Sequence, residues 1–110
     1  MNVNIKDMQD YLADRYGGWA TEQNMFLKLT EELGEVAEVV NKRSGCKPTG
    51  ETDLKEQLGS ELADMLHYIV ANAAINDIDL ENAVIEKDRT ASLKYGHTTN
   101  LEIYLNNLRK

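Results

Sequence analysis

The same pattern of apolar and acidic residues occurs twice in this chain, and both copies have the period of an α-helix. Residues 29–40 are LTEELGEVAEVV and residues 58–69 are LGSELADMLHYI. In each copy four apolar positions follow one another at spacings of 4, 3 and 4, beside two acidic residues that stand three apart. Residues three or four apart share one face of a helix. Each copy therefore predicts a helix with an apolar stripe and an acid pair at the edge of that stripe, and we expect the two stripes to pack together.

The remaining segments also show helical periodicity, so the sequence predicts an all-α fold. We expect helices over residues 5–16, 22–42, 53–76 and 80–94, and either a short final helix or an ordered tail over residues 101–110. The segment RSGCKPTGETD, residues 43–53, has no apolar period and contains turn-forming residues, which predicts a loop. No linker is long enough to divide the chain. Residues 1–110 are thus expected to form one small four-helix bundle-type domain.

The composition narrows the possible functions. The net charge is −7, so a basic nucleic-acid-binding face is not expected, and an anionic substrate would need a cation between itself and the protein. No run of about 18 apolar residues is present, so no membrane span is expected. The N-terminus lacks the apolar stretch of a signal peptide, and the single cysteine, Cys46, has no partner for an intrachain disulfide. These features predict a cytoplasmic protein.

The two acid pairs predict a metal site. They are Glu32 with Glu35, and Glu61 with Asp64. Carboxylates that lie close together raise one another's pKa, and a hard divalent cation relieves the repulsion. We therefore expect Mg²⁺ at these four residues, with Mn²⁺ as a substitute. The alternative is that the acids only solvate the edges of two amphipathic helices.

At these residues the chain resembles the MazG-like all-α nucleoside triphosphate pyrophosphohydrolases. The resemblance rests on KLTEELGEVAEVVNKRSG followed by ELADMLHYIVANAAINDIDLENAVIEK, and covers about residues 19–95 in a single-unit form. It implies hydrolysis of a nucleoside triphosphate to a monophosphate and pyrophosphate, with the four acids as metal ligands. It also implies that Glu32 or Glu35 accepts the proton of the attacking water, that Lys87 faces the phosphates, and that Asn24 lies near the nucleotide.

Two positions depart from the family pattern. Ala91 stands where many relatives have a polar residue, and Gly96 stands where they have proline. Arg89 or Lys94 is therefore expected to complete the triphosphate pocket. Trp19 precedes the second predicted helix, where it could stack on the base or plug the core.

The third predicted helix also has apolar residues outside its main stripe: Tyr68, Val70, Ala71 and Ala74. A helix that is apolar on two faces needs a second partner. We therefore expect a homodimer or homotetramer, with His67 at the surface or at the subunit interface.

Two other functions stay open at this stage. One is an enzyme like phosphoribosyl-ATP pyrophosphohydrolase, and the other is a non-catalytic helical oligomer that binds nucleotide or metal.

Overall fold

All regular structure in the described residues is helical, which confirms the all-α prediction. The computed structural model describes residues 1–45 and 53–110; the rest of the predicted loop, with Cys46, lies outside these ranges. The helices are α1 (Ile5–Tyr16), α2 (Glu22–Arg43), α3 (Leu54–Ile75), α4 (Leu80–Lys94) and α5 (Leu101–Leu108). The final segment is thus a helix. No helix in the described ranges has the length and apolar character that a membrane crossing requires.

Each helix begins at a residue whose side chain accepts a hydrogen bond from a backbone N–H of the first turn. The capping residues are Asn4, Thr21, Asp53, Asp79 and Asn100. Such caps satisfy backbone donors that have no partner inside the helix. This local chemistry explains why the predicted helix boundaries agree closely with the observed ones.

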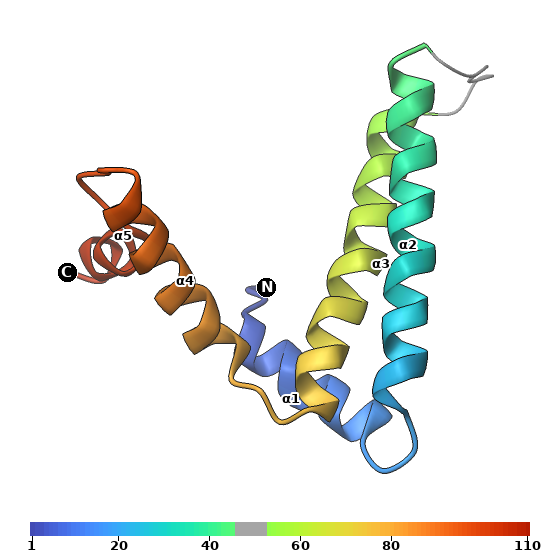
Figure 1. The fold of residues 1–110 in the computed structure, drawn as a ribbon, viewed down its shortest axis with the longest axis horizontal. Helices are drawn as coiled ribbons and strands as arrows, with labels where there is room; N and C mark the ends of the chain where they lie inside the picture. Colours follow the sequence, from blue (N-terminus) through green and yellow to red (C-terminus); the bar gives the residue numbers. More distant parts are fainter. Residues whose placement is uncertain (46–52) are drawn as a thin grey trace.

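Helices α2 and α3 form a long antiparallel hairpin, and α1 lies across the base of α3 (Figure 1). The core is at this base, where Leu12 and Tyr16 of α1 pack with Met25 of α2 and with Val70 and Ala71 of α3. The prediction that another subunit covers the second apolar face of α3 is therefore wrong. Its apolar residues are covered by α1 of the same chain, because α1 presents its own apolar face to them.

The residues that pack between α2 and α3 also differ in part from the predicted apolar stripes. Met25 and Val39 are buried on α2, whereas Leu33 and Val40 of the predicted stripe are exposed. On α3, Leu62 is likewise exposed. Both helices carry two neighbouring apolar stripes, and the stripe nearer to the acids is the one that packs.

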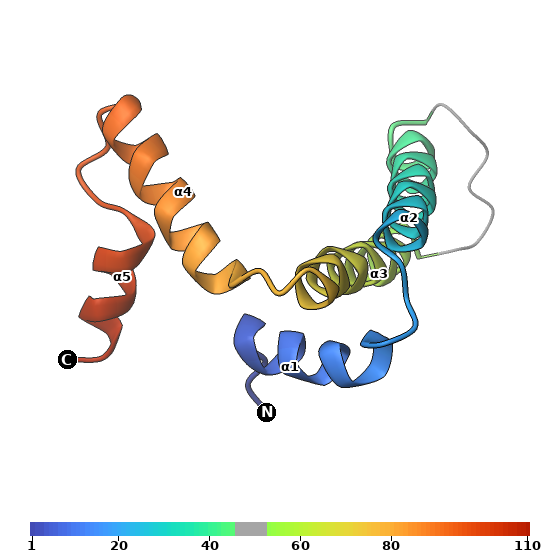
Figure 2. The same cartoon turned by 60° about the horizontal axis from the view of Figure 1, so that its bottom comes forward.

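Helices α4 and α5 form an arm that leaves the base and runs away from the hairpin (Figures 1 and 2). Gln9 of α1 fixes the start of the arm through hydrogen bonds with the Ile78 carbonyl and the Leu80 N–H. The Asp88 carboxylate accepts a hydrogen bond from the Leu101 N–H and so holds α5 against α4. The chain is an open V rather than a closed bundle, with a radius of gyration of 17.0 Å. A compact domain of this length has about 13 Å.

Candidate metal and nucleotide site

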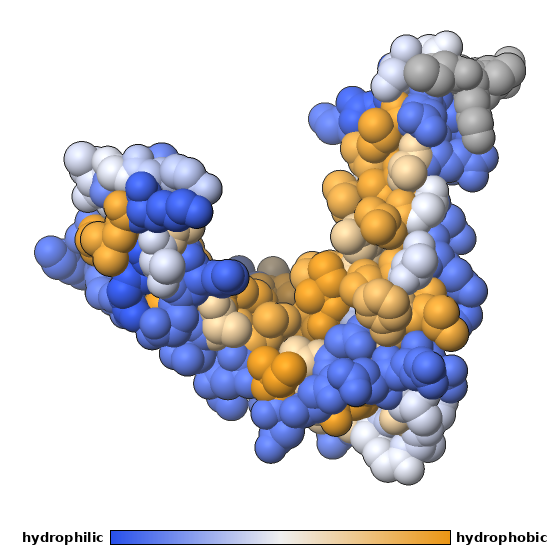
Figure 3. Space-filling model, viewed as in Figure 1, coloured by the Kyte–Doolittle hydropathy of each residue, from blue (hydrophilic) through white to orange (hydrophobic). Residues whose placement is uncertain are grey.

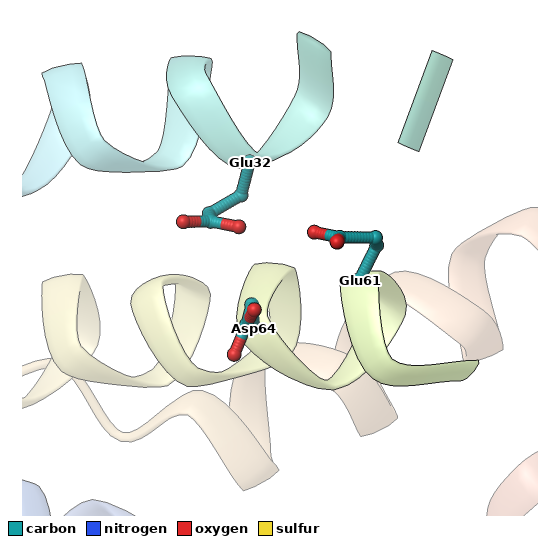
Figure 4. A group of neighbouring side chains, drawn as sticks. All are labelled: Glu32, Glu61 and Asp64. Carbon is teal, nitrogen blue, oxygen red and sulfur yellow. The ribbon is translucent and has the colours of Figure 1, made fainter. Parts of the chain in front are cut away.

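Three carboxylates from the two hairpin helices converge on one point. Glu32 extends from α2, and Glu61 and Asp64 extend from α3 (Figure 4). One oxygen of each lies within 4.8 Å of the others. The spacing of three residues between Glu61 and Asp64 places both on one side of α3. The structure thus brings together three of the four predicted metal ligands at a separation that a single cation can bridge.

Glu35, the fourth predicted ligand, lies beside this cluster and raises the pKa of Glu61 and of Glu32. A hydrogen bond shared with Glu35, together with burial and the charges of Glu35, Asp64 and Glu32, raises the pKa of Glu61 to about 7. The pKa of Glu32 is also raised, first by burial and then by the charges of Glu35 and Asp64. Glu61 therefore keeps its proton to a higher pH than a glutamate in water does.

Buried oxygens without partners show that the cluster fits a cation. Glu32 Oε2 and Glu61 Oε2 are buried and have no hydrogen-bond partner among the described residues, and the same holds for Gln57 Oε1. Buried polar oxygens normally have a donor or a cation beside them. A set of carboxylate and amide oxygens suits hard divalent ions such as Mg²⁺. Our sequence reasoning missed Gln57, although its position four residues before Glu61 places it one helical turn away on the same face.

A cavity of about 520 Å³ opens near the acids, between the end of α1, the first half of α2, and α3. Trp19, Asn24 and Tyr68 line it, together with Lys28 and Glu31, which lie within one helical turn of Glu32. The indole of Trp19 is 68% exposed, so this side chain does not plug the core. Its Nε1 donates a hydrogen bond to the Arg15 carbonyl, which fixes the ring at the wall of the cavity. The two predicted base-contacting residues, Trp19 and Asn24, thus lie together near the acids.

His67 is partly buried where α1 lies against α3. The prediction of a surface or interface histidine stays a prediction. Tyr16 Oη is 2.7 Å from His67 Nε2, and the two rings meet edge to face. Burial, and then the charge of Arg15, lowers the pKa of His67. The contact between Tyr16 and His67 links α1 to α3.

The cationic residues predicted to contact phosphate belong to α4. This helix runs away from the hairpin whose two helices carry the acids (Figure 2). Arg89 binds the carboxylates of Glu86 and Glu102, at 2.6 and 2.9 Å, and so connects α4 to α5. Lys87 and Lys94 line a separate hollow on α4. Arg89 therefore serves to hold α4 and α5 together. The structure does not bring Arg89, Lys87 or Lys94 to the acid cluster.

Comparison with known proteins identifies the family. The family model of the MazG nucleotide pyrophosphohydrolase domain matches residues 20–90, which include α2, α3 and most of α4. The chain belongs to the MazG family. It is accordingly a nucleotide pyrophosphohydrolase, as the resemblance implied.

Solved and curated relatives agree with this assignment. The crystal structure of iMazG from Vibrio DAT 722 superimposes with a TM-score of 0.62 at 27% identity, covering 84% of this chain and 98% of that chain. The uncharacterized protein YpjD of Bacillus subtilis is 40% identical over 88 residues, which is 74% of this chain and 79% of YpjD. Rat dCTP pyrophosphatase 1 is 40% identical over 76 residues, or 66% of this chain. The match spans only 45% of the rat enzyme's length.

Proposed function

We propose that this MazG protein is a Mg²⁺-dependent enzyme that hydrolyses a (deoxy)nucleoside triphosphate to the monophosphate and pyrophosphate, acting on non-standard or excess nucleotides. The observation that carries this proposal is the convergence of Glu32, Glu61 and Asp64 near a cavity with an aromatic wall. A triphosphate is strongly anionic, and an acidic chain binds it only through cations. Because two curated relatives are dCTP pyrophosphatases, dCTP is the first candidate substrate.

Glu32, Glu61 and Asp64 would hold the cation, because their oxygens lie within reach of one point and two of those residues have buried oxygens without partners. Bound there, a divalent cation would polarise the phosphoryl oxygens and make a coordinated water more acidic. The protein contributes the arrangement of the carboxylates, which two packed helices fix before substrate arrives.

Glu35 is our candidate for the group that takes the proton of the attacking water. It is exposed, lies next to the three converging carboxylates, and is within hydrogen-bond reach of Glu61. A general base must be within reach of the water and must retain a free oxygen. Glu35 meets both requirements better than Glu32, whose oxygen is buried inside the cluster.

The cavity beside the acids would hold the nucleoside. Trp19 offers the face of an indole ring for stacking on a base. The Asn24 side chain offers both a donor and an acceptor to the edge of the base or to the sugar. Lys87 and Lys94 remain our predicted phosphate contacts. They can reach the phosphates only if the α4–α5 arm approaches the α2–α3 hairpin that carries the acids.

A product assay tests the proposal. The purified protein is incubated with Mg²⁺ and a panel of dNTPs, NTPs and phosphoribosyl-ATP, and the products are separated by anion-exchange chromatography. We expect monophosphate and pyrophosphate from the wild type and from Asp14→Asn, a control on the exposed side of α1. Asp64→Asn should be inactive.

Release of diphosphate and orthophosphate would contradict the proposed bond cleavage. Metal binding without turnover of any nucleotide would instead favour the non-catalytic binding protein. Turnover of phosphoribosyl-ATP alone would favour the related enzyme.

A further inference from the structure

The aromatic wall of the cavity includes a residue from a segment with little apolar anchorage of its own. Trp19 belongs to the short connection between α1 and α2, and it is 68% exposed. Figure 3 shows pale, weakly polar residues at the foot of the hairpin, where α1 passes into α2. Connections on a protein surface move more than the helices they join. Because tight binding requires that a binding surface be ordered before the ligand arrives, this connection needs an anchor.

Tyr16, the last residue of α1, supplies that anchor. It belongs to the core and is only 7% exposed, yet part of it also lines the cavity. Its carbonyl accepts a hydrogen bond from the Ala20 N–H at 3.1 Å. Its ring centroid lies 5.6 Å from that of Trp19. Tyr16 therefore holds the connection through both its backbone and its ring, and a displacement of Tyr16 would also displace Trp19.

His67 holds the hydroxyl of Tyr16 from behind the wall. Tyr16 Oη lies 2.7 Å from His67 Nε2, and the two rings meet edge to face with centroids 5.6 Å apart. His67 is partly buried, and it is not among the described residues that line the cavity. An effect of His67 on a nucleotide in the cavity therefore has to pass through the residues of the wall.

Tyr68, the next residue along α3, joins the same network. It lines the cavity, and its ring meets that of His67 edge to face with centroids 4.8 Å apart. Burial, and then the proximity of Tyr16 and a hydrogen bond with it, raise the pKa of Tyr68. A phenolic hydroxyl can donate one hydrogen bond and accept another, so that of Tyr16 can serve both partners. Tyr16 thus connects the two other aromatic residues of the wall, Trp19 and Tyr68, to one imidazole.

We propose that His67 and Tyr16 are a positioning pair, which holds the aromatic wall of the cavity in place for the base of the nucleotide. His67 stands three residues after Asp64, so it lies about one helical turn from the acid cluster. The pair therefore fixes the wall relative to the carboxylates, although Trp19 comes from a separate segment. Neither residue acts on the phosphates. This inference rests on the proposed function, because it requires that the nucleoside occupy the cavity.

Steady-state kinetics with Mg²⁺ and dCTP, or whichever nucleotide of the panel the wild type cleaves fastest, test the pair. Tyr16→Phe loses only the hydroxyl, and His67→Phe keeps a ring in place of the imidazole. Each should raise KM by about threefold or more, as expected for a lost hydrogen bond, and keep kcat within about twofold of the wild type. The double variant should raise KM no further than Tyr16→Phe does, because both changes remove the same bond. A double variant whose KM rises by the product of the two single effects would overturn the pair.

Met8→Ala is the matched control for a merely structural role. Met8 also packs α1 against the core, but it is not among the described residues that line the cavity. This variant should lower the melting temperature at least as much as Tyr16→Phe does and should leave KM near that of the wild type. An equal rise of KM in Met8→Ala would mean that α1 only has to stay docked, and the positioning role would be refuted.

The fluorescence of Trp19 gives a readout without turnover, because Trp19 is the only tryptophan of the chain. Titration with the monophosphate product, dCMP in the first case, should change the emission of the wild type, and Tyr16→Phe and His67→Phe should need about threefold more dCMP or more. No change of emission in an active wild type would show that the nucleoside binds elsewhere, which refutes the proposed cavity and this inference together. Wild-type responses in both variants would refute the positioning pair alone.

Discussion

Binding of a divalent cation should weaken by about tenfold when the pH falls from 8 to 6. Glu61 has a pKa of about 7 because of its shared hydrogen bond with Glu35, its burial and the surrounding carboxylates. A carboxylate must lose its proton to bind a metal. With one proton titrating at that pKa, Glu61 is deprotonated in about nine tenths of the molecules at pH 8, in about half at pH 7 and in about one tenth at pH 6. Glu32, whose pKa is also raised, acts in the same direction.

Isothermal titration calorimetry with Mg²⁺ or Mn²⁺ measures this effect. Repeating the titration in buffers of different ionisation enthalpy gives the number of protons released for each cation bound. That number should fall from about one at pH 6 to about one tenth at pH 8. Glu61→Gln should lose most of the affinity, and the affinity that remains should depend less on pH, through Glu32 alone. Glu81→Gln, in the first turn of α4, should behave as the wild type. An affinity that is constant between pH 6 and 8 would refute the cluster as the binding site.

Four further outcomes follow from the structure. Without metal, the raised pKa of Glu61 contributes stability that is complete below about pH 4.5 and is lost as the pH rises through about 7. The melting temperature of the metal-free protein should therefore fall over this range, and Glu61→Gln should flatten the fall. Leu12→Ala removes a fully buried side chain of the core and should cost about 2–5 kcal/mol in urea denaturation; a loss well below that would mean that α1 is loosely packed. Lys87→Ala should lower kcat/KM by about tenfold or more, as expected for a lost charge-assisted phosphate contact, and should leave the melting temperature unchanged. Arg89→Ala should instead lower the melting temperature slightly and leave kcat/KM near that of the wild type. Trp19→Ala should raise KM for the preferred nucleotide about tenfold or more, since stacking on a base is worth about 1–3 kcal/mol, and Trp19→Phe should restore most of the affinity.

The sequence predicts the helices of this chain well because their ends are determined locally. Thr21, Asp53 and Asp79 are helix-capping residues in the sequence, and each caps a helix in the structure. The acid pairs are equally local, because a spacing of three residues places two carboxylates on one side of any helix. What could be predicted is therefore the set of helices and the faces on which their carboxylates lie.

Packing between helices could not be predicted in the same way. Leu33 and Val39 are both apolar residues of α2, and only the position of α3 decides that Val39 is buried and Leu33 exposed. The face containing Val70 looked unpartnered because the docking of α1 depends on contacts far apart in sequence. The direction of the arm, which keeps Lys87 away from the acids, likewise depends on a few contacts such as those of Gln9.

Part of the cavity wall lies outside the two helices that carry the acids, and this division has an evolutionary consequence. The carboxylates stand on the two long helices, whereas Tyr16 and Trp19 come from the end of α1 and the short connection after it. Substitutions in that connection can alter which base is accepted without disturbing the residues proposed to cut the phosphate chain. A duplicated gene could therefore acquire a new nucleotide preference by changes in a few residues near its N-terminus, while selection preserves the chemistry encoded further along.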